Sequence, residues 1–255
     1  MSFFVDVVTE DSFYENLMLG VMKILENSPC VKNVEIEMRS PCDRVALSTW
    51  EQRHCCNLPE EMRNFYASVD GFLLTWSLDI AGEEFPVGKM EIGDLASLKR
   101  FVGTKEQQAT AELNRREGLQ LPSFSPRCKL FEIGQCGESK IILVYQIASD
   151  QGEPGIWLYH ESKCQWHYIT SNFTNYFRMM LVHLGLPLWQ YCVVGLSLPT
   201  WVEQVFFLVG PHLLPTTIKF KETLSTTLWN EGPINVIDPT IFKGKESKQR
   251  ILKKK

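Results

Sequence analysis

The segment Trp50–Trp76 constrains the fold of this chain most tightly, because it marks the start of a helix, its end and the strand after it. Pro59 is suited to a first helical position, where its missing N–H is no loss. Glu60-Glu61 follow in the first turn, where the helix dipole favours negative charge. Asp70-Gly71 then supplies a residue that tolerates a left-handed backbone just past the helix. The segment therefore predicts a helix that leads directly into a strand.

Apolar side chains in this predicted helix recur at i, i+3, i+4 and i+7: Met62, Phe65, Tyr66 and Val69. Such a stripe is typical of a helix face that packs on a core. Phe72–Trp76 continues as an apolar, β-rich run, which predicts a buried strand. The segment contains no obvious nucleophile, general base or set of metal ligands. We therefore interpret it as architecture and not as an active site.

The remaining elements follow from hydrophobic period and turn residues. Further helices are predicted at 13–25, 43–55, 171–184 and 199–208, and further strands at 34–38, 85–92, 128–133, 141–147, 155–160 and 165–169. Asp43, Asp94 and Ser171 are the expected helix caps. The last four strands are separated by short turns, which is typical of an antiparallel meander. Helices before and after a run of strands indicate an α+β domain with a central, mostly antiparallel sheet.

Two stretches differ from the rest of the chain. Only six of the 25 residues in 103–127 are apolar, so we expect a mobile insertion between strands, part of which is helical. Beyond Leu214 the apolar period is weak, and an extended or disordered tail is expected. The predicted organisation is one domain over 10–212 followed by a basic tail over 213–255.

The 255 residues lack the apolar run of about 20 that a membrane helix needs. The N-terminus is short, contains Asp6 and has no basic region before its apolar residues, so it does not resemble a signal peptide. Eight cysteines show no regular spacing. Without an export signal, these features predict reduced thiols and a cytoplasmic protein that does not enter a membrane.

Charge is distributed unevenly along the chain. The formal net charge is −4, and the residues 243–255 carry +6, so the remaining 242 residues carry −10. The basic side chains of the tail are Lys243, Lys245, Lys248, Arg250, Lys253, Lys254 and Lys255. An acidic body argues against a general nucleic-acid binder. The tail is a candidate contact for an acidic partner, with a solvated end as the simpler alternative.

Residues that could carry catalysis do not form a convincing set. His160, Cys164 and His167 offer three zinc ligands where four are usual, and residues at the end of a hairpin are the simpler interpretation. Cys55 and Cys56 follow His54 directly, but sequence adjacency is not the spatial dyad that a thiolate nucleophile needs. Phosphate-binding loops and dinucleotide fingerprints are absent from the sequence. We expect no catalytic residue, no cofactor and no metal.

Aromatic residues are the remaining signal. Seven Trp and Tyr side chains crowd into 35 residues: Trp157, Tyr159, Trp166, Tyr168, Tyr176, Trp189 and Tyr191. Most of them are expected in the core. Trp189, Tyr191 and Trp201 follow the break at Gly185–Pro187, so we expect these three to be exposed and name them as the candidate partner surface.

Two blocks of the sequence resemble a known family. The first consists of Ser48-Thr-Trp-Glu-Gln52, Leu58-Pro-Glu-Glu61, Asn64-Phe-Tyr66, Asp70-Gly-Phe72 and Thr75-Trp-Ser77. The second consists of Trp166-His-Tyr-Ile-Thr170, Phe173-Thr, Tyr176, His183-Leu-Gly-Leu-Pro187 and Trp189-Gln-Tyr191. Together they resemble the tubulin polyglutamylase complex subunit 2 family. The first block alone is the general pattern of the wider SUKH superfamily.

The resemblance implies a SUKH-like α+β fold and a non-catalytic scaffold or targeting subunit. Its implied partners are a tubulin tyrosine ligase-like catalytic subunit, other subunits of the complex, and tubulin in microtubules. The implied location is the cytoskeleton, near centrioles and cilia. A free-standing SUKH-type binding module with another client is the first alternative. The second is an enzyme, which a pocket containing His160, His167 and an acidic residue of shifted pKa would support.

Overall fold

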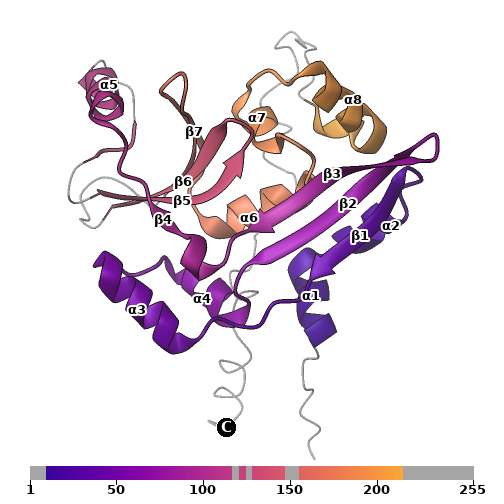
Figure 1. Ribbon diagram of the computed structural model, residues 1–255, viewed down its shortest axis with the longest axis horizontal. Coiled ribbons are helices and arrows are strands. Elements are labelled where there is room, and N and C mark those ends of the chain that lie inside the picture. Colours follow the sequence, from indigo (N-terminus) through magenta and orange to yellow (C-terminus); the bar gives the residue numbers. More distant parts are fainter. Residues whose placement is uncertain (1–9, 117–120, 125–127, 147–154, 215–255) are drawn as a thin grey trace, which may run out of the picture.

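The computed structural model describes residues 10–116, 121–124, 128–146 and 155–214 (Figure 1). Its helices are α1 (Glu10–Met18), α2 (Val21–Glu26), α3 (Arg44–His54), α4 (Glu60–Ser68), α5 (Lys105–Arg116), α6 (Phe173–Val182), α7 (Trp189–Val194) and α8 (Thr200–Val209), with short 3-10 turns η1 (Leu95–Ser97) and η2 (Pro211–Leu213). The tail after Leu214 lies outside the described residues.

The strands are β1 (Val31–Glu37), β2 (Phe72–Ile80), β3 (Glu83–Ile92), β4 (Lys99–Arg100), β5 (Cys128–Cys136), β6 (Ser139–Gln146), β7 (Gly155–His160) and β8 (Gln165–Thr170). Every pairing among them is antiparallel, which confirms the α+β expectation. The pairing is divided between two sheets, in the orders β1-β2-β3 and β4-β5-β6-β7-β8, where one central sheet was expected.

A capped turn explains the division into two sheets. After β3, the Asp94 side chain accepts a hydrogen bond from Ser97 N (2.8 Å) and starts η1, as predicted. Asp70 Oδ1, at the end of α4, accepts one from Leu95 N at 2.8 Å and holds this turn in place. The chain therefore leaves the first sheet before it resumes as β4 beside β5.

The helix-to-strand unit that the sequence marked most clearly is present. Pro59 directly precedes α4, and the four apolar residues of the predicted stripe are fully buried. Gly71 has φ of +94°, and a Cβ there would also approach the backbone of Ile92, so glycine is required at this turn. Asp43 caps α3 by accepting from Val45 N, as predicted.

Two local expectations were wrong. The segment 13–25 forms two helices, because Leu19 and Gly20 have φ of 53° and 82° and so separate α1 from α2. The cap of α6 is Asn172, whose side chain accepts from Asn175 N at 2.8 Å, and not Ser171.

Part of the segment 103–127 is helical, as expected, since it contains α5. Leu121 and Phe124 pack against a small cluster on the five-stranded sheet that includes Phe101 and Trp166. The rings of Phe124 and Trp166 have centroids 6.0 Å apart. This segment therefore contributes contacts to the sheet, and its predicted mobility remains a prediction.

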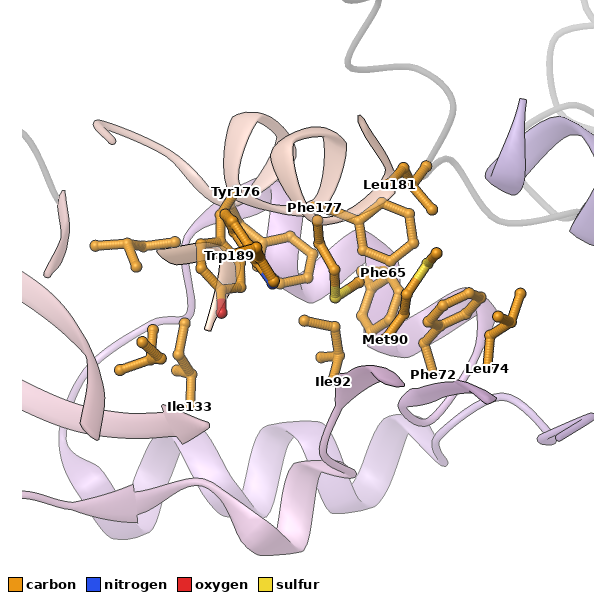
Figure 2. Close-up of a cluster of buried hydrophobic side chains, with 14 of the residues drawn as sticks. Phe65, Phe72, Leu74, Met90, Ile92, Ile133, Tyr176, Phe177, Leu181 and Trp189 are labelled. Atoms are coloured by element: carbon orange, nitrogen blue, oxygen red, sulfur yellow. The ribbon is translucent and has the colours of Figure 1, made fainter. Parts of the chain in front are cut away.

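The main core joins the two sheets under α6. Figure 2 shows Tyr176, Phe177 and Leu181 of α6 above Phe65, Met90 and Ile92. The phenyl rings of Phe65 and Phe177 have centroids 5.9 Å apart. Glu61 Oε2 on α4 accepts a hydrogen bond from Thr174 N at 2.9 Å, which ties α4 to the start of α6. No helix within the described ranges is long and apolar enough to cross a bilayer.

Candidate functional site

Trp189 was expected at the surface, and this expectation was wrong. Its side chain is 3% exposed. It stacks on His183, with ring centroids 5.2 Å apart and an interplanar angle of 26°, and lies 5.3 Å from Tyr176 (Figure 2). α7 begins at Trp189 and directs its first side chain under α6, so this indole fills the core and is not available to a partner.

Tyr191 was also expected to be exposed, but its side chain is half-buried. Its hydroxyl lies 2.8 Å from the hydroxyl of Ser139, which is fully buried at the start of β6. This hydrogen bond ties α7 to the five-stranded sheet. Only the outer part of the ring is therefore open to a partner.

Trp201 is exposed, as expected, with 56% of its surface accessible. Two further large apolar side chains of α8 that the sequence did not single out, Phe207 and Leu208, are also exposed. A signal was present: seven of the ten residues of α8 are apolar. One buried stripe of a helix cannot hold so many, so some must face solvent.

The surroundings of α8 are almost free of charge. Leu184–Leu214 is 31 residues long and contains one formally charged residue, Glu203. Depletion of charge and exposed aromatic side chains are both typical of the centre of a protein–protein interface. The candidate site is therefore the exposed side of α8, with Tyr191 at its margin. The basic residues 243–255 lie outside the described part of the chain.

His160 and His167 lie on one face of the β7–β8 hairpin. Strand pairing places His167 opposite Leu158, which puts it on the same face of the hairpin as His160. Burial, and then electrostatic interaction with His160 and Lys163, lower the pKa of His167. No carboxylate contributes to this shift. Among the described residues no group of three or more His, Cys, Asp or Glu is placed to hold a metal ion.

An open cavity of about 670 Å³ lies elsewhere, at the end of α3. Its lining comes from Ser48, Glu51, Gln52, Cys55, Cys56, Asn57 and Tyr145. Glu51 is engaged structurally, since it accepts from Leu58 N (3.1 Å) and pairs with Arg63 (3.4 Å). Burial raises the pKa of the Cys56 thiol, which disfavours the nucleophilic thiolate.

His54, which directly precedes these cysteines, packs against aromatic rings. Its ring lies between Trp50 and Phe131, with centroids 4.3 Å and 5.3 Å away. Its backbone carbonyl and that of Cys55 accept hydrogen bonds from the buried Lys129 ammonium. Lys129 thereby supplies hydrogen bonds to carbonyl groups at the C-terminal end of α3, which is a structural role.

Comparison with known proteins places the chain in a family. Residues 41–179 match the SMI1 / KNR4 family (SUKH-1). The chain is 34% identical to the tubulin polyglutamylase complex subunit 2 of Rattus norvegicus, over 94% of this chain and 84% of the relative. The chain belongs to the tubulin polyglutamylase complex subunit 2 family.

Two other members of the family give the same result. The subunits 2 of Mus musculus and Homo sapiens are each 33% identical, over 94% of this chain and 84% and 82% of their own lengths. No solved structure matches the chain. The SUKH-1 match ends within α6, so α7 and α8, which form the candidate site, lie beyond it. The similarity to the subunit 2 relatives, in contrast, extends over both helices.

Proposed function

We propose that this chain is a non-catalytic scaffold and targeting subunit of a tubulin polyglutamylase complex. The observation that carries the proposal is the similarity to relatives named as subunit 2 of that complex, which covers 94% of the chain. A subunit requires other subunits. The nearly uncharged surface around Trp201 is the type of surface that a stable partner covers.

The partners in this proposal are a tubulin tyrosine ligase-like catalytic subunit and tubulin itself. Glutamate addition is assigned to the ligase-like subunit, and this chain holds it near its substrate. The exposed side of α8, with Trp201 and Tyr191, attaches the chain to the complex. The basic residues 243–255 contact acidic tubulin tails or an acidic subunit. The corresponding location is the cytoplasm, on microtubules near centrioles, centriolar satellites and cilia.

Affinity purification from ciliated cells tests membership in the complex. The tagged full chain is recovered under mild conditions, and the recovered proteins are quantified against a tag-only control. Recovery of a tubulin-glutamate ligase together with tubulin is the expected result. If neither is recovered, the SUKH-1 match favours the alternative, a free-standing binding module with another client.

A glutamylation assay tests the non-catalytic role separately. Purified full chain is mixed with tubulin, ATP and labelled glutamate, with and without the ligase-like subunit. We expect no incorporation by the chain alone and more incorporation when it is added to the ligase. Incorporation by the chain alone would overturn the non-catalytic assignment.

A further inference from the structure

Large apolar side chains remain in solvent on one side of α8. Trp201, Phe207 and Leu208 are 56%, 65% and 54% exposed. Positions 201 and 208 are seven residues apart and project in nearly the same direction, and 207 projects about 100° farther round the helix, with the exposed Gln204 between them. The opposite side of α8 is buried through Val202, Val205 and Phe206. The helix is therefore fixed to the core on one side, and its other side presents three large apolar side chains together with Glu203 and Gln204.

The end of the β2–β3 hairpin adds to this surface. Phe85 pairs with Leu78, so both point to the face of the sheet that carries the core, and Ile80 shares that face by alternation. Leu78 is buried, whereas Ile80 and Phe85 are 46% and 43% exposed. The hairpin thus extends its apolar face beyond the part that the helices cover.

α8 and the hairpin are neighbours. The Cys30 thiol donates to the carbonyl oxygen of Leu208 at 3.9 Å, and the carbonyl of Cys30 accepts from Asp79 N at 2.8 Å. Figure 1 shows α8 beside the far end of the hairpin. We call Ile80, Phe85, Trp201, Phe207 and Leu208 the α8–hairpin face.

Charges at the margin of this face are acidic. Glu83 pairs with Ile80 and shares its face, and Glu203 lies on α8, whereas Asp79 and Glu84 pair with each other and point to the opposite face. Neither 78–88 nor 184–214 contains a lysine or an arginine. Lys32, on the adjacent strand β1, pairs with Ser77 and therefore points to the other face of the sheet.

We propose that the α8–hairpin face binds a helix of a partner protein, with an apolar stripe flanked by lysines and arginines. Amphipathic helices bind apolar surfaces through anchors at i, i+3, i+4 and i+7. Trp201 and Phe207 are the expected anchors, since aromatic side chains dominate interface energetics. The acidic margin selects basic flanks and orients the helix. This inference rests on the proposed function, because it names the chemistry of a partner within the complex.

A pair of synthetic peptides tests this chemistry. Both are labelled helices of about 20 residues with the same leucine stripe, one flanked by lysines and one by glutamates, and each is titrated with the full chain by fluorescence anisotropy. We expect the lysine peptide to bind at least about tenfold more tightly at low salt, with a smaller difference at high salt. Equal binding of the two peptides would overturn the proposal.

Variants of the face locate the binding. The double variant F207D/L208D should weaken the lysine peptide by about tenfold or more, since it places charge in the apolar centre. V45D, on the exposed side of α3, is the matched control and should bind as the unchanged protein does. Both variants should keep the unfolding midpoint of the unchanged chain, because all three side chains are exposed. Unchanged peptide binding by F207D/L208D would overturn the proposal.

A photo-crosslinker at position 207 of the full chain identifies the occupant. Crosslinks to the lysine peptide support the inference, whereas crosslinks to residues 215–255 of the same chain or to a second copy overturn it.

Affinity purification with F207D/L208D separates this inference from the proposed function. Ligase and tubulin recovered at unchanged yield contradict the inference alone, and their loss supports it. Failure to recover them with the unchanged chain contradicts the proposed function.

Discussion

The imidazole of His183 lies where protonation is unfavourable. One ring nitrogen, Nδ1, is 2.7 Å from the carbonyl oxygen of Met179, and the ring stacks on Trp189. Burial lowers the pKa of His183, while the hydrogen bond to Met179 opposes this effect more weakly. The folded protein therefore holds this histidine in its neutral form down to a lower pH than the unfolded chain does.

This difference predicts a loss of stability in mild acid. Between the lowered pKa and the unfolded value of about 6.5, the unfolded chain binds more protons, so the free energy of unfolding falls as pH falls through this range. H183Q should make the free energy of unfolding depend less steeply on pH. H212Q, at an exposed position, should not. Urea unfolding at several pH values measures both. His54 and His167, whose pKa values are also lowered, should leave a residual slope.

The two tryptophans of the candidate surface should respond very differently to truncation. W189A removes a buried indole and should cost about 3–5 kcal/mol of unfolding free energy, the usual range for a large aromatic side chain in a core. W201A removes an exposed one and should change it by about 0.5 kcal/mol or less. Chemical denaturation of both variants checks this. Similar losses for the two would contradict the burial of Trp189.

At the scale of elements, the β2–β3 hairpin depends on close contact between a glycine and an indole. Trp76 is buried, and its Nε1 donates to the carbonyl oxygen of Leu184 at 2.8 Å. A Cβ on Gly88, the partner of Trp76 across the strands, would overlap this indole. The hairpin and the end of α6 are thereby held together.

G88A should therefore destabilise the protein by at least about 1–3 kcal/mol, the usual cost of overpacking. The indole would have to move and lose its hydrogen bond. G134A in β5 is the matched control, since a Cβ there meets Ile141 only at 4.0 Å. Denaturant midpoints and near-UV circular dichroism of both variants measure the effect. A G88A midpoint equal to that of G134A would show that the strand accommodates the methyl group.

Elements whose signals are local were predicted well. The α4–β2 unit follows from Pro59, its apolar stripe and Gly71, all within one short segment, and β7 was predicted with its observed bounds. α7 was missed because it has only six residues and its cap, Leu188, adopts a left-handed backbone without a side-chain hydrogen bond. Such a helix is specified by tertiary packing and not by its own residues.

The candidate site was predicted only in part, for the same reason. Trp189 and Trp201 each stand two residues after a proline, and packing under α6 is what buries Trp189. Trp201 was correctly expected to be exposed. Phe207 and Leu208 were overlooked because apolar residues of a helix are assigned to the core by default. Ile80 and Phe85 depend on where the helices stop covering the sheet, which no local pattern encodes.

For the molecule as a whole, charge is separated along the chain. The tail 243–255 carries +6 and the other 242 residues carry −10. In the proposed contact with an acidic partner, repulsion from the acidic body opposes binding, and the basic segment offsets this repulsion locally. In the proposed complex, the mainly apolar attachment through α8 and the electrostatic contact through the tail are separate functions. The tail contact should therefore weaken more steeply with salt than the attachment through α8.

Neutralising the tail tests this separation. Replacing its seven lysines and arginines by glutamine should weaken microtubule co-sedimentation at low salt, with the difference vanishing at high salt as screening removes it. Each exposed contact contributes roughly 0.2–1 kcal/mol, so the tail should tune binding and not supply all of it. Glutamine at the exposed Lys23, Lys32 and Lys105 is the control and should have little effect. Unchanged low-salt binding by the tail variant would remove the tail from the interaction and leave targeting to the apolar surface.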